Sequence, residues 1–329
     1  MSKKITVIGG AGFIGTYLCK ALSNIQQDFE IIDLKISKKF SKKSKIGDVR
    51  DIESLRQTVT GDVVIFLAAA HRDDIFNKME YRLTNVNGAE NVAKVCEEKK
   101  ISKIIFTSSV AVYGFPKIET DENGEINPFN EYGRSKFEAE EKLRNWQRAR
   151  NTQLIIVRPT VIFGEGNRGN VFNLFNQIAL RRFIMIGEGK NKKSMAYVRN
   201  VAAFLQKCIA SKRKYCVYNY VDTPNCTMNE LVLYLRYKLL GKSGVGIRLP
   251  YWLGLTLGYF ADLASLILRK NLSISSIRVK KFASSSEFNS NKENLDGFIP
   301  PFSLFEGIDK TLQSEFISPD PKREIFLTE

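Results

Sequence analysis

The chain has 329 residues, of which 43% are hydrophobic, so it is long and apolar enough to bury a large core rather than remain disordered. Its 50 Lys and Arg against 35 Asp and Glu give a net charge of +15, which favours anionic partners such as phosphates or an anionic membrane surface. The basic residues are scattered and no nucleic-acid recognition motif is present, so we expect no nucleic-acid partner. The five cysteines form no CxxC pair, which disfavours a metal site and a disulfide framework.

Short β-branched runs alternate with amphipathic helical patterns through the first half of the chain. We expect buried strands at residues 5–8, 30–32, 63–67, 104–106 and 154–157. Helices are expected between and after them, near residues 13–23, 52–59, 81–99 and 132–147. This alternation predicts an α/β fold of the Rossmann type, with a doubly wound parallel sheet covered on both faces.

The rhythm of the sequence loosens in the second half. One more strand is expected at Val217–Val221, and Thr227 with Glu230 forms a capping box that opens a helix. The C-terminal part is predicted to be rich in loops. We therefore expect residues 1–165 to form a nucleotide-binding domain and residues 166–329 a smaller α/β substrate lobe, the two intertwined as one structural unit.

A glycine-rich motif follows the first predicted strand. Gly9, Gly12 and Gly15 have the spacing GxxGxxG, in which the first glycine permits a tight turn, the second lets the backbone approach a pyrophosphate, and the third lets helix and strand pack closely. Phe13 and Ile14 open the helix whose free N–H groups would face the phosphates. Because the motif lies between a predicted strand and a predicted helix, it indicates a dinucleotide site.

The choice of dinucleotide depends on Asp33, which ends the second predicted strand. A carboxylate at this position binds the adenosine ribose hydroxyls and repels a 2′-phosphate, so we expect NAD rather than NADP. Lys35, Lys38 and Lys39 follow closely and could accommodate a phosphate, which keeps NADP as the alternative.

Three further positions could border the cofactor. Asp48 and Val49 could lie beside the adenine, although a helix cap at Asp48 or Asp51 is an equally good interpretation. Ala68 begins a run of three alanines at the end of the predicted strand at 63–67. Small side chains there would let a flat cofactor lie against the strand ends.

Tyr132 and Lys136 form the central chemical motif, YGRSK, in a predicted helix. Residues four apart share a helix face, and a neighbouring cation lowers the pKa of a phenol, so Tyr132 is predicted to act as a general base. Ser109 follows the predicted strand at 104–106, where it can bind the oxygen that Tyr132 deprotonates, with Ser108 as the competing candidate. His71, the one histidine, follows the predicted strand at 63–67. It is a candidate substrate contact, and a purely structural role is the alternative.

These motifs together resemble the extended short-chain dehydrogenase/reductases, a family of nucleotide-sugar epimerases and dehydratases. The matching pieces are GGAGFIG, GDVRD, FLAAA, TSSVAVYG, YGRSK and RPTVIFG, and the similarity continues through most of the chain. The resemblance implies a catalytic triad, a cofactor role for Asn85, and contact between the Pro159–Val161 backbone and the nicotinamide. It also puts Asn167 and Arg168 among the expected substrate contacts. The triad that it implies is Ser109, Tyr132 and Lys136.

One departure from the family pattern is informative. The 4,6-dehydratases carry an Asp-Glu pair just after the catalytic hydroxyl residue, whereas this chain has Val110 and Ala111. These side chains cannot exchange protons, so elimination of water is disfavoured. The resemblance then implies 4-epimerisation or reduction of a keto sugar, with NAD as cofactor.

Further stretches, among them AAAHRDD, KSMAYV and VYNYVD, are very similar to those of a branch of 4-epimerases that act on GlcNAc linked to undecaprenyl diphosphate in bacterial surface-polysaccharide synthesis. Soluble UDP-sugar 4-epimerases and UDP-4-keto-sugar reductases are the alternatives. The resemblance also suggests a homodimer. It implies a cytoplasmic protein that works at the inner face of the membrane.

A long apolar segment, residues 249–268, bears on that location. It carries one charge, Asp262, an aromatic Trp252 near its start, and the basic residues Arg269 and Lys270 after its end. A charge at the bilayer centre costs about 3 kcal/mol, so we expect a helix lying in the membrane interface rather than a span. The alternative is a buried helix of the substrate lobe.

Overall fold

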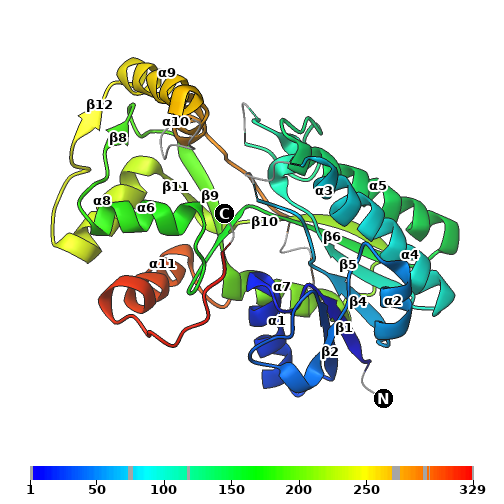
Figure 1. Ribbon diagram of the computed structural model, residues 1–329. Helices are drawn as coiled ribbons and strands as arrows, with labels where there is room; N and C mark the ends of the chain where they lie inside the picture. The colour runs from blue at the N-terminus through cyan, green and yellow to red at the C-terminus, as the bar shows by residue number, and fades with distance from the viewer. Residues whose placement is uncertain are drawn as a thin grey trace.

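A computed structural model describes residues 3–72, 77–116, 119–268, 275–291, 295 and 297–327. Within these residues, seven parallel strands form one sheet in the order β10-β6-β5-β4-β1-β2-β3 (Figure 1). Their bounds are β1 (Ile5–Ile8), β2 (Phe29–Asp33), β3 (Ser44–Ile46), β4 (Val63–Phe66), β5 (Lys103–Thr107), β6 (Gln153–Pro159) and β10 (Tyr215–Tyr220). The strand order reverses between β1 and β4, which is where such sheets bind ligands at their carboxyl edge.

Helices cover both faces of this sheet, which confirms the predicted Rossmann-type fold. On β4, Val63 and Ile65 pack into a core with α1 and α7, whereas Val64 and Phe66 pack into a second core with α2, α4 and α5. The helices of this half are α1 (Phe13–Asn24), η1 (Ser41–Lys43), α2 (Ile52–Thr58), α3 (Met79–Tyr81), η2 (Arg82–Asn87), α4 (Gly88–Glu98), η3 (Val110–Tyr113), α5 (Glu131–Arg150) and α7 (Val198–Ala210).

The remaining elements form a second lobe beside the sheet (Figure 1). Its strands are β7 (Val161–Phe163), β9 (Lys192–Tyr197) and β11 (Asp222–Thr227) in one sheet, and β8 (Met185–Ile186) and β12 (Arg248–Leu249) in another. Its helices are α6 (Asn170–Ala179), α8 (Met228–Leu240), α9 (Tyr251–Leu268), α10 (Ser276–Ala283), α11 (Leu304–Leu312) and η5 (Gln313–Ile317). The predicted capping box is confirmed, because Thr227 and Glu230 bond each other's backbone at the start of α8.

The structure bears on two expectations for the second half of the chain. The C-terminal part combines the expected loops with helices α10, α11 and η5, which were not predicted. The division after residue 165 stays a prediction, but α7 and β10 follow that point in sequence and belong to the sheet half.

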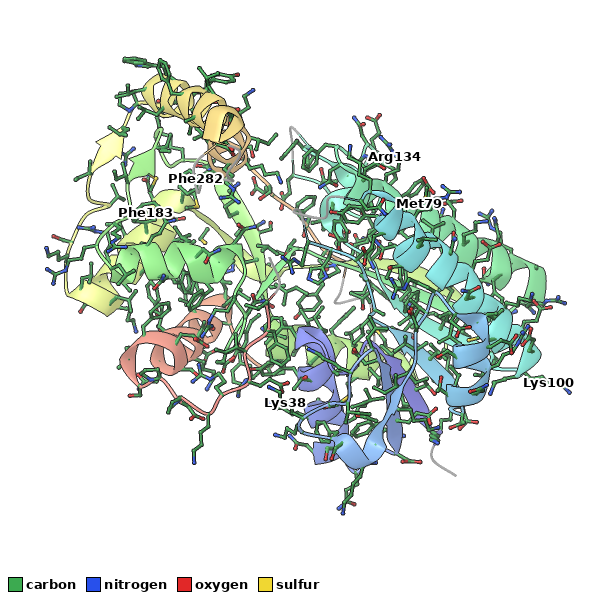
Figure 2. All side chains as sticks on the ribbon, in the orientation of Figure 1. Lys38, Met79, Lys100, Arg134, Phe183 and Phe282 are labelled. Carbon is green, nitrogen blue, oxygen red and sulfur yellow. The ribbon has the colours of Figure 1, made fainter. Side chains whose placement is uncertain are left out.

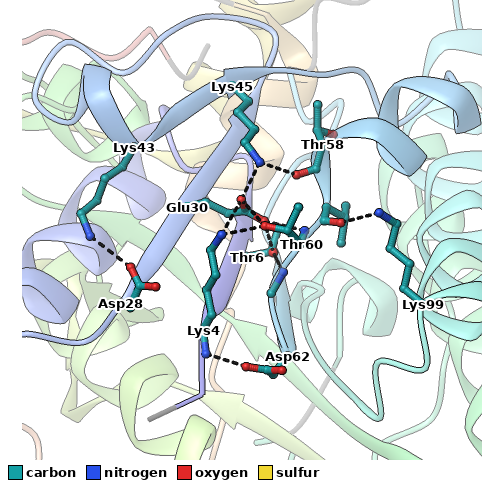
Figure 3. Close-up of polar contacts among 12 residues, drawn as sticks. Lys4, Thr6, Asp28, Glu30, Lys43, Lys45, Thr58, Thr60, Asp62 and Lys99 are labelled. Atoms are coloured by element: carbon teal, nitrogen blue, oxygen red, sulfur yellow. Dashed lines mark hydrogen bonds and ion pairs between the residues drawn. The ribbon is translucent and has the colours of Figure 1, made fainter. Parts of the chain in front are cut away.

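The amino-terminal edge of the sheet is closed by a polar cluster around Glu30 (Figure 3). The buried carboxylate accepts hydrogen bonds from the Thr6 hydroxyl, the Thr60 hydroxyl and the Thr60 N–H, each at 2.7 Å, and from Lys45 Nζ at 2.8 Å. Burial opposes ionisation of Glu30, but the bonds from Lys45, Thr60 and Thr6 outweigh it and lower its pKa to about 2. This cluster fixes β1, β2 and β3 at the end of the sheet opposite to the ligand edge.

Helix α9 packs against its own lobe through its smallest residues. A Cβ atom on Gly254 would lie 2.6 Å from Cγ2 of Ile186, and one on Gly258 would lie 2.8 Å from Cα of Ser276. The carboxylate of Asp262 accepts the Ser276 N–H at 3.2 Å, so the one charge of the segment caps the start of α10. The predicted basic flank at 269–270 lies outside the described residues.

Among the helices that the structure describes, none is sufficiently long and apolar to cross a membrane.

Candidate active site

The glycine turn between β1 and α1 lies too close to neighbouring backbone for larger residues. Gly9 has φ +84°, and a Cβ atom built on it would lie 2.5 Å from the backbone N of Ala68. A Cβ atom on Gly15 would lie 2.5 Å from the carbonyl O of Gly9. Gly12 is the N-cap of α1 and has no side chain to bond the first N–H groups of the helix. These N–H groups are therefore available to an anion at the carboxyl edge of the sheet.

Phe13 and Ile14 anchor this turn through their side chains. The Phe13 ring is buried, and its centroid lies 5.6 Å from that of Tyr17 and 5.6 Å from that of Phe326. Ile14 packs against the core that α1 shares with the sheet. Only the backbone N–H groups of these two residues can meet a cofactor phosphate.

Asp33 lies at the end of β2, beside the glycine turn. One carboxylate oxygen accepts the N–H of Ala11 at 3.0 Å, and burial raises the pKa of the carboxyl. Asp33 is half-buried at the edge where the strand order reverses, so its carboxylate can bind hydroxyl groups of a ligand.

The next two predicted contacts have partners inside the protein. Asp48 forms a salt bridge with Arg50 at 2.7 Å, and this hydrogen bond lowers the pKa of Asp48. Asp51, rather than Asp48, is the N-cap of α2, where it accepts the N–H of Glu53. Val49 is buried, and a role of Asp48 or Val49 beside the adenine stays a prediction.

Asn85 joins three elements below the site. Its Oδ1 accepts the N–H of Ala70 at 2.9 Å, and its Nδ2 donates to the Ala70 carbonyl at 2.9 Å and to Ser135 Oγ at 2.8 Å. The Ser135 hydroxyl in turn donates to the Tyr132 carbonyl at 2.8 Å. This buried chain ties the segment after β4 to the first turn of α5, and it gives Asn85 a positioning role that the sequence motif alone did not reveal.

Three hydroxyl residues follow one another at the end of β5. Ser108 is buried, whereas Ser109 is half-buried and its Oγ accepts the N–H of Ala111 at 3.1 Å. Within the described part of the chain, the hydroxyls of Thr107 and Ser108 have no hydrogen-bond partner. Ser109 keeps its O–H to donate and is less buried than Ser108, so the geometry favours Ser109 over Ser108 as the group that meets a substrate.

The first turn of α5 packs directly on the segment that follows Ser109. A Cβ atom on Gly133 would lie 2.4 Å from the carbonyl O of Ala111, so no larger residue fits between Tyr132 and Arg134. This close approach brings the half-buried Tyr132 to the same edge of the sheet as Ser109. The predicted pair therefore comes from two elements that glycine allows to touch.

Lys136 lies one turn after Tyr132 and is buried. Its ammonium lies 4.6 Å from the centroid of the Phe106 ring, and no hydrogen-bond acceptor among the described residues contacts it. Burial lowers the pKa of Lys136 to about 7, although Glu140 acts in the opposite direction. A buried ammonium without an acceptor is suited to the hydroxyl oxygens of a bound ligand.

Two further predicted contacts lie just after or at the end of strands of the large sheet. His71 is exposed after β4, and its Nδ1 lies 3.2 Å from the Ala69 carbonyl. Pro159 ends β6 and is buried beside Tyr220 of the neighbouring strand. Their contacts with substrate and nicotinamide stay predictions.

Asn167 and Arg168 lie against the C-terminal segment. Asn167 is buried, and Arg168 forms a salt bridge with Glu315 at 2.9 Å while its guanidinium stacks over the Phe172 ring at 4.0 Å. The Arg168 N–H also donates to the Phe326 carbonyl at 3.0 Å. Arg168 thus has structural partners, and its expected contact with substrate is untested.

One buried ion pair behind the site was not predicted. Arg158 on β6 donates to both carboxylate oxygens of Glu140, at 2.9 and 2.6 Å, and to the Tyr113 hydroxyl at 2.6 Å. Glu140 follows Tyr132 and Lys136 at steps of four, so all three lie on one face of α5. This spacing is the signal that could have identified Glu140 as the residue that fixes α5 to the sheet.

The site as a whole fits a dinucleotide. The glycine turn leaves room and N–H groups for phosphates, Asp33 offers acceptors for ribose hydroxyls, and Lys136 offers a buried donor. The unpartnered hydroxyls at the end of β5 lie at the same edge. These residues would hold NAD between the glycine turn and the start of α5.

Comparisons with known proteins agree with this geometry. The model of the NAD dependent epimerase/dehydratase family matches residues 5–220. The N-acetyl-alpha-D-glucosaminyl-diphospho-ditrans,octacis-undecaprenol 4-epimerase of Escherichia coli O157:H7 is 44% identical over 100% of both chains. The UDP-glucose 4-epimerase of Vibrio cholerae is 25% identical over 95% of this chain and 96% of its own.

Solved structures share the fold. The UDP-N-acetylglucosamine 4-epimerase from Bacillus cereus superposes with a TM-score of 0.75 at 18% identity, over 98% of this chain and 99% of its own. The UDP-glucuronic acid 4-epimerase from Bacillus cereus in complex with NAD gives a TM-score of 0.72 at 19% identity, over 94% and 96%.

Proposed function

The chain belongs to the NAD dependent epimerase/dehydratase family, and we propose that it is a 4-epimerase that interconverts GlcNAc and GalNAc on undecaprenyl diphosphate. The observation that carries the proposal is the 44% identity, over the whole of both chains, with the Escherichia coli O157:H7 4-epimerase. Such a reaction belongs to the synthesis of bacterial surface polysaccharides of the O-antigen type. The alternatives are a soluble UDP-sugar 4-epimerase for UDP-GlcNAc or UDP-Glc, and a UDP-4-keto-sugar reductase.

The residues at the edge of the sheet divide the work of this reaction. Tyr132 removes the proton from the C4 hydroxyl of the sugar and later returns it. Ser109 donates a hydrogen bond to the same oxygen, and the positive charge of Lys136 favours the phenolate form of Tyr132. NAD, when bound, would supply the acceptor for the hydride from C4 and the donor that returns it. Because the configuration is inverted, the 4-keto sugar must turn over before it is reduced.

The residues after Ser109 argue against a dehydratase. Val110 and Ala111 occupy the first positions of η3, and neither side chain can exchange a proton. Removal of water from the sugar would need an acid and a base at this point. The same site therefore supports chemistry at C4 alone.

We also propose that the protein works at the inner, cytoplasmic face of the cell membrane. The support comes from α9, whose glycines face the lobe while Trp252 and Phe260 are 67% and 64% exposed. Tyr259 and Leu263 add to the same exposed face. An apolar helix face rich in aromatic side chains binds at the headgroup boundary, and a protein with net charge +15 is attracted to anionic lipid. An undecaprenyl-linked substrate also remains in the bilayer.

Product analysis tests the reaction. The purified protein is incubated with GlcNAc linked to undecaprenyl diphosphate and, separately, with UDP-GlcNAc, and the released sugars are identified. We expect conversion of the lipid-linked sugar to GalNAc with no net change in NADH absorbance. Conversion of UDP-GlcNAc alone would establish the soluble epimerase. The reductase is tested separately with a UDP-4-keto sugar and added NADH, and stoichiometric consumption of both would establish it.

Vesicle co-sedimentation tests the membrane proposal. Wild type should pellet with anionic vesicles at low salt, and the double variant Trp252→Glu/Phe260→Glu should remain in the supernatant. Tyr237→Glu on α8 is the matched control, because Tyr237 is 68% exposed in the same lobe. Wild type that stays in the supernatant contradicts the proposal.

Sedimentation velocity in the same buffer tests the expected homodimer, which should have twice the mass of one chain.

A further inference from the structure

Two exposed aromatic rings lie beside the catalytic edge. Phe115 and Phe129 are 47% and 42% exposed, and their ring centroids are 4.4 Å apart. Their two segments are joined, because the Asn127 N–H donates to the Val112 carbonyl at 3.0 Å. Phe129 precedes Tyr132 by three residues, just before the start of α5. The protein thus places an apolar pair in solvent at the mouth of its own site.

Helix α10 connects this pair with the exposed face of α9. The ammonium of Lys281 lies 5.1 Å from the Phe129 ring, and that of the preceding Lys280 lies 5.4 Å from the ring of Tyr259 on α9. The position of α10 is fixed from inside the lobe by Phe282, whose ring lies 6.0 Å from that of Phe183 (Figure 2). Helix α10 therefore contacts the aromatic pair through Lys281 and packs against α9 (Figure 1).

We propose that Phe115 and Phe129 bind the first isoprene units of the substrate's lipid chain as it leaves the sugar, and that the chain then follows α10 to α9. This inference rests on the proposed function, since it presumes a prenyl-linked sugar. The two lysines of α10 border the track, where they complement the charge of the diphosphate that joins sugar and chain. The phenylalanine pair is therefore expected to distinguish lipid-linked from nucleotide-linked sugars.

The occupant of this track is a chain rather than a protein surface. A stable interface between proteins buries about 800 Å² on each partner, far more than two rings offer. A methyl-branched prenyl chain is linear and apolar, and it needs only a row of exposed apolar side chains to follow. Ile277 on α10 is 53% exposed and lies one turn before Lys281, on the same face of the helix.

The test uses a lipid short enough to stay in solution, so that membrane binding does not enter. The NAD-loaded protein and its Phe115→Ser/Phe129→Ser variant are assayed with farnesyl-diphosphate-linked GlcNAc. The inhibition constant of the chain-free analogue methyl-diphospho-GlcNAc is measured in parallel. Phe115→Leu/Phe129→Leu keeps apolar area at both positions, and Tyr237→Ser is the matched control on α8. Thermal melting verifies that each variant is folded.

Loss of two apolar contacts should raise KM for the farnesyl-linked sugar by about 10-fold or more, with kcat within about 2-fold of wild type. The inhibition constant of the chain-free analogue should not change, and the leucine variant should recover most of the loss. An equal weakening of the chain-free analogue, or no effect on KM, overturns the inference. If wild type converts no lipid-linked sugar at all, the proposed function fails first, and that result is distinct from either outcome.

Discussion

The two ends of β2 carry carboxylates that the protein treats in opposite ways. Glu30, near the amino edge, receives hydrogen bonds from Thr6, Thr60 and Lys45, and its pKa falls to about 2 (Figure 3). Asp33, at the carboxyl edge, accepts the Ala11 N–H, and burial raises the pKa of its carboxyl. The carboxylate at the amino edge contributes stability through contacts within the fold, whereas the carboxylate at the ligand edge lies where a ligand can bind.

Buried lysines show the same contrast. Lys103, at the start of β5, donates to the carbonyls of Ile209 and Ser211, each at 2.7 Å. Lys136, on the catalytic face of α5, contacts the Phe106 ring and no acceptor among the described residues. The amino edge of the sheet is internally satisfied, and the carboxyl edge keeps donors and acceptors in reserve. This difference assigns stability to one edge and chemistry to the other.

The largest effect is expected at Tyr132. Tyr132→Phe removes only the acid/base oxygen, so turnover should fall by roughly 10²–10⁴-fold while NAD remains bound. Turnover is measured by sugar analysis and bound NAD by absorbance after denaturation. Near-normal activity in this variant would rule out Tyr132 as the base.

The two serines after β5 allow two residues at the carboxyl edge to be compared directly. Ser109→Ala should lower kcat by about 10-fold or more, because one hydrogen bond to the reacting oxygen is lost. Ser108→Ala should have a smaller effect, since its buried hydroxyl has no partner among the described residues. Steady-state kinetics of both variants decide this point, and the reverse order would mean that Ser108 faces the substrate.

Variants of the two buried lysines should separate effects on activity from effects on stability. Lys136→Met should abolish activity yet stabilise the cofactor-free protein by a few kcal/mol near pH 7, since a buried ammonium is removed. The folded pKa of about 7 lies below the usual 10.5, so the wild-type penalty is complete below pH 7 and fades as the pH rises towards 10. Denaturant titrations at pH 6.5 and 9.5 should show the advantage shrinking.

Lys103→Met is the counterpart at the amino edge. It should keep activity and gain little or no stability, because the Ile209 and Ser211 carbonyls lose their donor. Equal activity losses in Lys103→Met and Lys136→Met would remove the distinction between the two edges.

The smallest effects are expected for the two carboxylates of β2. Glu30→Gln should cost about 2 kcal/mol at neutral pH with NAD affinity unchanged. Because the folded pKa of Glu30 lies below 4.5, this stability is present above pH 4.5 and is lost as the pH falls towards 2. Asp33→Asn should leave stability nearly unchanged but weaken NAD binding by about 10-fold. Calorimetric titration with NAD measures the affinity, and urea titrations measure the stability, of each variant. Weaker NAD binding by Glu30→Gln, or a loss of stability in Asp33→Asn, would contradict the roles given to the two carboxylates.

The sequence was sufficient for the parts of the fold that depend on local pattern. Alternating runs predicted the first strands to within one or two residues, and the glycine spacing predicted a turn in which Gly9 has φ +84°. The capping box at Thr227 was likewise a local signal, and the same signal at Ser303 and Glu306 marks the start of α11. Helix α11 was not predicted because that second capping box was passed over.

What the sequence could not provide depends on contacts between distant segments. Asp262 looked like a charge out of place in an apolar run, and its partner Ser276 is supplied by another helix. Only packing shows that the glycines of α9 face Ile186 and α10 while Trp252 faces out. The pairing of Phe115 with Phe129 likewise arises from the folding together of two loops.

We expect that one site inverts C4 of the sugar without net redox change. The most direct measurement uses undecaprenyl-diphosphate-linked GlcNAc with deuterium at C4, incubated with purified protein and no added nucleotide. We predict GalNAc that retains the deuterium at C4, because the same hydrogen leaves and returns within one active site. Loss of the label to solvent, or a product that forms only when NADH is added, would contradict inversion at C4 within one site.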